Sequence, residues 1–395
     1  HTLQNTGAEI SSFDFSFGNH SFKQGFDVLY NGIQQEFGIF KGAHLGGPED
    51  FYKAINLGQP YFLDEFSYNI ENPKQEVSHH LAKISAYKRF YNIGKISLQY
   101  SFQLNNRKEY DIRKGDLSET PSMDLRLTTH NASLTHLLER GKWNIESGIS
   151  VGLQDNFPNP ATKARRLIPD YFRYDAGIFS VFKFQINDQL NAEAGTRYDF
   201  NRYDAYKYYD ASVWEKYANL FPEFFLKESD SRVLTHPVLD YHNFSGNVGF
   251  NYLLNNNWNF KLNFSRAERA PNAAELFADG LHHSAAIMEE GVLNMKKESI
   301  YHLNFSTIAK VDFLKGLSFE INPYLMFSDS FINQIPTGVK STNRGVFVVW
   351  SYQQIKARIF GVDADAELRF TDLLKLNSSF SALRGDDLGN QEPLI

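Results

Sequence analysis

The chain has 395 residues, a formal net charge of −6 and no cysteine, and 15% of its residues are aromatic, including 35 Phe and 21 Tyr. The charge is close to neutral and Lys and Arg form no stripe, so the electrostatic footprint of a nucleic-acid-binding protein is missing. A chain without cysteine has neither a disulfide framework nor a thiolate metal site, and no apolar window approaches the ~18 residues of a transmembrane helix.

In chain order, most of the sequence alternates between apolar and polar residues, which predicts β-strands with two different faces. Residues 96–104 alternate Ile, Leu, Tyr, Phe and Leu with Ser and Gln, and the pattern returns at 143–153, 257–264 and 360–370. These strands exceed the usual ~5–6 residues. They match the ~9–11 tilted residues that cross a bilayer core.

The connections between the strands alternate in length. Short polar turns are predicted at 91–94, 139–141, 187–189, 255–257 and around Asp372. Long irregular segments lie between them, at about 42–78, 156–171, 203–240, 266–298 and 333–344. This layout is typical of an outer-membrane β-barrel with extracellular long loops. We therefore expect an all-β chain of about fifteen strands that forms part of a transmembrane antiparallel β-barrel.

A soluble β-sandwich or propeller is the alternative, because its strands also alternate. Its strands are shorter and its turns follow every ~8–12 residues, whereas the turns of this chain are about twice as far apart. The polar faces carry many charges, including Glu146, Arg197 and Asp365. Unpaired charges cannot face a packed core, since desolvation costs several kcal/mol each, but they can line a hydrated lumen.

One segment carries a specific motif. Residues 265–280, SRAERAPNAAELFADG, resemble the barrel motif of TonB-dependent outer-membrane receptors, in which a strand ends in a form like SRAFRAP and an E-L-[FY]-x-D-G segment and a His follow. The segments 38–46, 103–111, 166–171 and 357–363 also resemble barrel strands of the family, and residues 383–386 and 393–395 resemble the stretch before its penultimate strands. Two positions depart from the pattern: Glu268 stands where the family has Phe, and 291–295 replaces an N-P-N-L box.

The resemblance covers nearly all of residues 1–395. The motif sequences are similar to the versions of the family found in Bacteroidetes. The resemblance implies a barrel of about 22 strands with a plug, placed in the bacterial outer membrane, that imports a scarce ligand with energy from TonB, ExbB and ExbD. The plug domain with its TonB box and the terminal strands are not found in this sequence. We therefore expect the chain to be part of a longer polypeptide.

The pair His282–His283 is the sharpest chemical feature of the 266–298 segment. Imidazole is the commonest metal ligand, and imidazole with carboxylate oxygens suits zinc or iron. One hypothesis is that one or both histidines, together with Glu289 or Glu290, contact a metal or a metal chelate in the outer vestibule. The alternative is a pair of solvated loop histidines, because a zinc site needs three or four ligands in a defined geometry. His44, in a Gly-rich loop, is a weaker candidate for the same site.

The aromatic residues of the 203–240 segment are the second candidate site. Tyr208, Tyr209 and Trp214 are expected either to stack on a catecholate or a porphyrin, or equally to pack the loop over the barrel mouth or lie near lipopolysaccharide. The carboxylates of Asp363, Asp365 and Glu367 share one strand face. They are interpreted as lumen wall rather than as acid–base machinery.

No nucleophile, P-loop or metalloprotease motif occurs, so the sequence does not indicate an enzyme. We expect a receptor for active uptake of a metal or metal chelate, namely a ferric siderophore, haem or zinc, which is transported rather than held as a cofactor. The expected partners are TonB–ExbB–ExbD, outer-membrane lipid and lipopolysaccharide, and the small chelate, with no nucleic acid. A passive porin-like channel and an adhesin are the alternatives.

Overall fold

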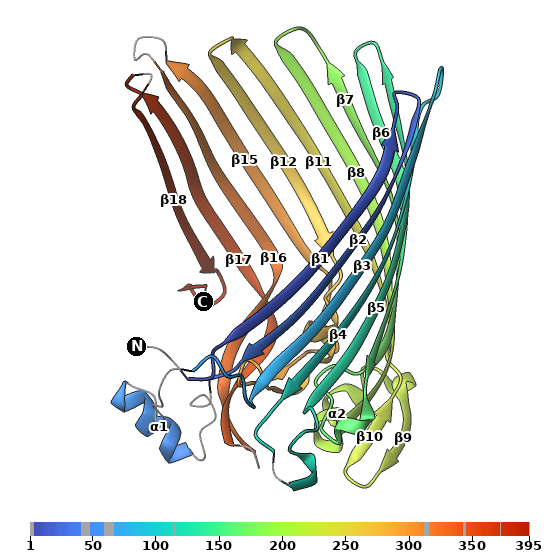
Figure 1. Cartoon of the computed structure of the whole chain (residues 1–395), viewed down its shortest axis with the longest axis vertical. Coiled ribbons are helices and arrows are strands. Elements are labelled where there is room, and N and C mark those ends of the chain that lie inside the picture. Colours follow the sequence, from blue (N-terminus) through green and yellow to red (C-terminus); the bar gives the residue numbers. More distant parts are fainter. Residues whose placement is uncertain are drawn as a thin grey trace.

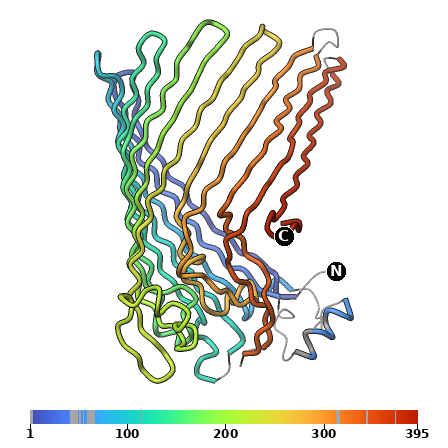
Figure 2. Tube along the Cα trace, turned by 180° about the vertical axis from the view of Figure 1, so that it is seen from behind, coloured from blue at the N-terminus to red at the C-terminus, as the bar shows by residue number. Residues whose placement is uncertain are grey.

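A computed structural model describes residues 4–40, 48–58, 67–113, 115–311, 316–342, 345–371 and 373–394. Long tilted strands curve into a barrel wall, and all connections at one end of this wall are short (Figure 1). The helices and the long connections gather at the other end, as the view from behind also shows (Figure 2). We call these two ends the short-turn end and the long-loop end.

The wall is one antiparallel meander in which each long strand pairs with the next long strand along the chain. Its strands are β1 (Ala8–His20), β2 (Gln24–Gly38), β3 (Lys74–Phe90), β4 (Gly94–Tyr110), β5 (Met123–Arg140), β6 (Trp143–Pro158), β7 (Asp170–Gln185), β8 (Leu190–Asp210), β11 (Val238–Asn255), β12 (Trp258–Arg269), β15 (Glu298–Val311), β16 (Leu317–Thr342), β17 (Gly345–Arg369) and β18 (Lys375–Asp387).

Smaller elements lie in the connections or beside the last strand. They are α1 (Pro48–Leu57), α2 (Ala211–Ala218), α3 (Ala273–Phe277), β9 (Phe225–Ser229), β10 (Arg232–Thr235), β13 (Asp279–His282), β14 (Ile287–Glu290), β19 (Glu392–Pro393) and three 3-10 turns at Gly115–Leu117, Pro160–Thr162 and Pro222–Phe224. None of the helices in the described part of the chain is long and apolar enough to cross a bilayer.

The two faces of the wall differ in chemistry, as the alternation predicts. Large apolar side chains such as Ile149, Val151 and Phe250 are exposed on the outer face. The opposite face carries ion pairs such as Arg197–Asp199, whose Nη2 and Oδ1 lie 2.6 Å apart. An exposed apolar face of this extent suits lipid, and the charged face suits a hydrated lumen. The fold prediction is thus confirmed.

The first and last wall strands do not close the barrel. Among the described residues, β1 pairs only with β2, and β18 pairs only with β17 and β19. An unpaired strand edge inside a bilayer leaves backbone groups without hydrogen-bond partners, which costs several kcal/mol for each group. The wall is therefore one part of a larger barrel.

The short turns predicted at 91–94, 139–141, 187–189 and 255–257 are confirmed, whereas Asp372 lies outside the described residues. Asn side chains explain the tightness of two of them. Asn255 Oδ1 accepts hydrogen bonds from the backbone N–H groups of Asn257 and Trp258, at 2.9 and 3.0 Å. Asn187 Oδ1 bonds the backbone of Gln189 and Leu190 in the same way. These are Asx-type turns, in which the side chain replaces a backbone acceptor.

The segment 333–344 differs from its prediction as a loop. Residues 333–342 continue β16, and β17 begins at Gly345. The pairing shifts register between Pro336 and Gly338, which interrupts the alternation and explains why the sequence pattern ends there. His44, predicted as a site residue, lies outside the described residues.

The lipid-facing assignment generates a testable pair of substitutions on β12. Leu262→Arg puts a charge on the exposed apolar face and is expected to lower the free energy of unfolding by about 2–4 kcal/mol. Asn263→Arg puts the same charge on the opposite face and is expected to cost less than about 1 kcal/mol. Denaturant unfolding of the membrane-inserted protein measures both. Equal losses in the two variants would contradict the two-faced wall.

Candidate functional site

Three long connections pack together at the long-loop end into one unit. We call residues 159–169, 211–237 and 270–297 the loop body. Its core is aromatic: the ring centroids of Tyr171 and Tyr203 are 5.7 Å apart, and those of Tyr203 and Phe277 are 5.9 Å apart, both edge to face. The other buried side chains of this core include Tyr209, Trp214, Phe224, Leu276 and Leu293.

The predicted aromatic site divides into buried and exposed residues. Tyr209 and Trp214 are only 3% and 5% exposed, and their rings pack 5.8 Å apart. Of the two interpretations left open for them, the structure shows packing of the loop. Tyr208 is 49% exposed on the other face of β8, so only its ring has the access that a ligand contact requires.

A charge clamp explains how the motif at the end of β12 folds the loop body. The Arg269 guanidinium donates to both carboxylate oxygens of Glu275 at 2.9 and 3.0 Å, and to Glu298 at 2.5 Å. Both glutamates are nearly buried. Asn272 and Glu275 also form a capping box that starts α3. The clamp therefore ties β12, β15 and α3 together.

Glu268, which departs from the Phe of the resembling motif, has partners of its own. Its carboxylate accepts hydrogen bonds from the backbone N–H of Phe244 at 2.8 Å and from Lys297 Nζ at 2.6 Å. Arg266 also pairs with it. Three hydrogen-bond donors offset the desolvation cost of this buried carboxylate. At Glu268 the chain therefore has a local ion network where the resembling motif has an aromatic side chain.

The histidine pair lies in a small hairpin, β13–β14, which extends the sheet by parallel pairing with β17. His282 Nδ1 is 2.7 Å from Glu289 Oε1. Its Nε2 lies 2.9 Å from Arg107 Nη2 and 3.5 Å from Glu109 Oε1, at the end of β4. Ser284 also donates to Glu109, at 2.8 Å. The hairpin is therefore fastened to the opposite part of the wall.

His283 is buried rather than solvated. It is 3% exposed, and its Nδ1 lies 3.2 Å from Asp111 Oδ2. Glu290 accepts a hydrogen bond from Ser351 Oγ at 3.2 Å. Across the described residues, no group of three or more His, Cys, Asp or Glu side chains is arranged to hold a metal ion. Metal ligation by His282 and His283 stays a prediction, and the geometry gives both rings a role in ion pairs.

The charge state of His282 follows from its neighbours. Burial alone lowers the pKa of an imidazole, but the hydrogen bonds and charges of Glu109 and Glu289 outweigh burial and raise the pKa of His282 to about 9. The two carboxylates thus favour the protonated ring, whereas Arg107 Nη2, which can only donate, lies 2.9 Å from Nε2 and favours the neutral ring. A protonated imidazole has no lone pair for a metal.

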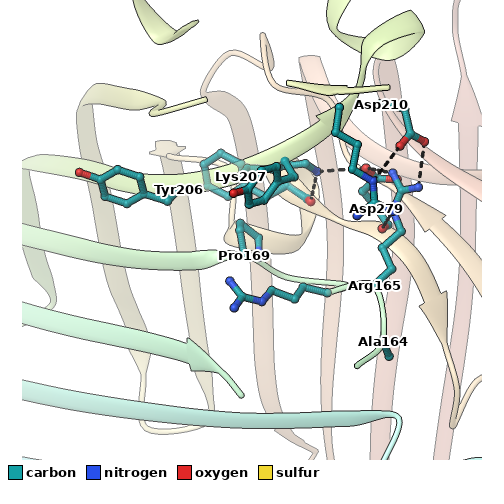
Figure 3. A pocket seen from close by; sticks show the side chains of 11 residues that line it. Ala164, Arg165, Pro169, Tyr206, Lys207, Asp210 and Asp279 are labelled. Carbon is teal, nitrogen blue, oxygen red and sulfur yellow. Dashed lines mark hydrogen bonds and ion pairs between the residues drawn. The ribbon is translucent and has the colours of Figure 1, made fainter. Parts of the chain in front are cut away.

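A cation-lined pocket of about 230 Å³ opens beside the residues that precede β7, next to the last residues of β8 (Figure 3). Arg165 crosses it and pairs with Asp210 at 2.9 Å and with Asp279 at 2.5 Å. Further side chains that line it are Arg166, Tyr206, Lys207, Tyr208, Arg232 and Phe277. Four cationic groups and two carboxylates line the pocket, and Asp170 beside it pairs with Arg166, so the positive excess is about one charge.

Lys207 forms the floor of the pocket and is 5% exposed. Its Nζ donates to the backbone carbonyl of Phe277 at 2.5 Å and lies 3.7 Å from Asp279. At the far end of β8, well beyond the ~9–11 residues that cross a bilayer, burial lowers the pKa of this amine to about 8. Lys207 remains largely protonated at neutral pH.

Sequence reasoning missed the residues that complete both sites. Arg107 and Glu109 are far from His282 along the chain, and Arg165 and Lys207 are far from Asp279. Only the register of the wall brings these segments together. The signals near the pocket were the resemblance of 166–171 and 265–280 to the family and the candidate residue Tyr208.

Comparison with known proteins identifies relatives of this architecture. Residues 3–394 match the family model described as "TonB dependent receptor-like, beta-barrel". No curated protein matches the sequence. Solved structures match in fold at low identity, so each of them shows the architecture alone.

Three of these structures illustrate the range. One described as "Copper transporter OprC" has a TM-score of 0.71 and 13% identity, over 99% of this chain and 55% of its own. The hemophore receptor HasR of Serratia marcescens, in complex with its hemophore HasA and heme, has a TM-score of 0.63 and 12% identity. The match covers 95% of this chain and 54% of HasR. The siderophore receptor PirA of Acinetobacter baumannii has a TM-score of 0.64 and 12% identity. The match covers 99% of this chain and 55% of PirA. The chain thus spans about 55% of the length of OprC.

The charge clamp predicts an asymmetric pair of substitutions. Arg269→Met leaves Glu275 and Glu298 buried without their cation, and is expected to destabilise the loop body by roughly 3 kcal/mol. Arg166→Met breaks a half-exposed pair with Asp170 and is expected to cost less than about 1 kcal/mol. Hydrogen exchange of residues 270–297 measures the difference. Unchanged protection in Arg269→Met would show that the clamp does not hold the loop body.

The raised pKa of His282 predicts loosening of the hairpin in alkali. Its contribution to stability is fully present below pH 6.5, the unfolded value, and is lost as pH rises through about 9. Protection factors of the β13–β14 amides are therefore expected to fall between about pH 7 and pH 10. His282→Gln removes this titrating group, so its lower protection should fall less over that range, and the remaining change reports Lys207 beside Asp279. A wild-type hairpin with constant protection would rule out the ion pairs of His282.

Proposed function

The chain belongs to the TonB-dependent receptor family, and on that premise we propose that the full-length protein takes up an anionic metal chelate actively. The family consists of receptors and transporters rather than enzymes. The barrel is an outer-membrane protein. What remains to be argued is the cargo and the part of this chain that meets it.

The similar structures support a metal-containing cargo. Their descriptions name copper, heme and a siderophore as what those proteins carry or bind. For this chain we propose a chelate rather than a bare zinc ion. Carboxylates already lie against His282 and His283, and the Arg107 guanidinium 2.9 Å from His282 Nε2 repels a metal cation.

The pocket of Figure 3 is the observation that carries the anionic assignment. Arg232 is 55% exposed at its side chain and pairs with Asp210 only at 3.7 Å. Arginine forks suit carboxylate and catecholate oxygens. The exposed rings of Tyr206 and Tyr208 offer flat apolar walls beside these cations. At about 230 Å³ the pocket fits one arm of a chelate rather than a whole siderophore.

In the proposed mechanism the loop body collects the chelate on the extracellular side, and no bond of the cargo is made or broken. Transport through the lumen then requires the plug and energy from TonB, ExbB and ExbD. A charged, hydrated lumen wall such as that of Arg197 and Asp199 lets a polar cargo pass.

The test is a set of titrations of the full-length protein in detergent with haem, zinc and a panel of ferric siderophores. The double variant Arg232→Gln, Tyr208→Ala is expected to lose about tenfold in affinity for a ferric catecholate or carboxylate chelate, because it removes a charge-assisted hydrogen bond and a stacking surface. Arg140→Gln, at the short-turn end of β5, is the matched control and should bind like the wild type.

Two outcomes would contradict the proposal. Tight binding of zinc that is lost in His282→Ala, His283→Ala would place a bare metal at the hairpin instead. Uptake of chelate by cells that lack TonB, at the wild-type rate, would favour the passive channel.

A further inference from the structure

Three tyrosine–histidine pairs on the outer face of the wall share one geometry. In each pair the Tyr hydroxyl lies 2.7–2.8 Å from His Nδ1 on the neighbouring strand. In each, the His stands two residues from the Tyr's direct cross-strand partner, on the long-loop side. The pairs are Tyr30–His80 on β2 and β3, Tyr100–His130 on β4 and β5, and Tyr198–His242 on β8 and β11.

These pairs lie at a boundary on the outer face. On the short-turn side of Tyr100 and Tyr198 the outer face carries exposed apolar side chains, such as Leu98 on β4 and Val248 on β11. On the long-loop side of the histidines the same face becomes charged: Arg126 follows on β5, and Arg202 forms two 2.7 Å bonds to Asp240 beside His242. A change from apolar to charged side chains on a lipid-facing wall marks the edge of the hydrocarbon core.

Each Tyr hydroxyl and His Nδ1 share one hydrogen bond, and the tautomer of the imidazole decides which group donates. A neutral ring that accepts the Tyr hydroxyl proton at Nδ1 carries its own proton on Nε2. Within the described part of the chain no hydrogen bond engages Nε2 of His130 or His242, whereas His80 Nε2 lies 3.0 Å from Ser78 Oγ. Each pair therefore presents a hydrogen-bond donor, either the ring N–H or a serine hydroxyl, at the height where lipid headgroups begin.

We propose that the three outward tyrosine–histidine pairs are binding sites for phosphate groups of lipids in the leaflet on the long-loop side. The phosphate oxygens accept from the imidazole Nε2–H groups, and from Ser78 at the first pair. Arg126, whose guanidinium lies 5.2 Å over the Phe157 ring, supplies a cation in the same headgroup layer. The tyrosine holds each ring in the tautomer that a phosphate requires.

The chain contains its own control for this geometry. Tyr324 and His302, on β16 and β15, have the same diagonal register. They lie on the opposite face, because Leu303 and Leu325 are the exposed neighbours. Their rings meet edge to face at 6.3 Å. A lumen-facing pair cannot reach lipid, so it separates an effect of the pair itself from an effect of its position.

The experiment is native mass spectrometry of the full-length protein with lipid A that carries two phosphates, and with the same lipid after its phosphates are removed. The triple variant His80→Phe, His130→Phe, His242→Phe is expected to lose at least about tenfold in affinity for the phosphorylated lipid. Tyr30→Phe, Tyr100→Phe, Tyr198→Phe keeps the imidazoles but frees their tautomer, so a smaller loss is expected. His302→Phe should bind as the wild type does.

Heat-modifiable migration on gels establishes that each variant still forms the barrel. The proposal is overturned by wild-type affinity in the triple histidine variant, by an equal loss in His302→Phe, or by equal binding of the two lipids to the wild type. A tenfold loss confined to the phosphorylated lipid and to the outward histidines supports it.

Discussion

Inside a bilayer every backbone N–H and C=O group must find its partner within the protein, and this requirement shapes the whole chain. The antiparallel meander from β1 to β18 meets it along the wall by pairing each strand with its neighbours. Alternation then places Val151 toward lipid and Ser150 toward the lumen in consecutive positions. The same alternation puts the Tyr–His pairs on the outer face and Arg197 on the inner one.

The segments of the loop body do not belong to a continuous sheet, so contacts other than strand pairing must stabilise them. An aromatic core around Tyr203 and Phe277 supplies apolar burial. Ion pairs supply the connections to the wall: Arg269 joins α3 to β12 and β15, and His282 joins the β13–β14 hairpin to β4. Many charges of the loop body are thus used for its own structure, and the proposed chelate site lies in the pocket beside Arg232.

The sequence predicts the wall well because alternation is local, and each residue's face follows from its neighbours alone. The short turns are equally local, since Asn255 and Asn187 build them from adjacent residues. The contacts of His282 with Glu109, and of Lys207 with Phe277, depend on strand register and could not be derived from spacing. The sequence left open whether Trp214 contacts a ligand or packs in a core. In the folded loop its side chain is buried.

The central claim is that the loop body faces the cell exterior, where a chelate arrives. The chain has no cysteine, so single cysteines report position cleanly. Glu228→Cys in the β9–β10 hairpin and Asn256→Cys in a short turn would be treated with a membrane-impermeant maleimide on intact cells. The account predicts labelling at position 228 before lysis and at position 256 only after it. Labelling of position 256 on intact cells, with position 228 protected, would contradict the account.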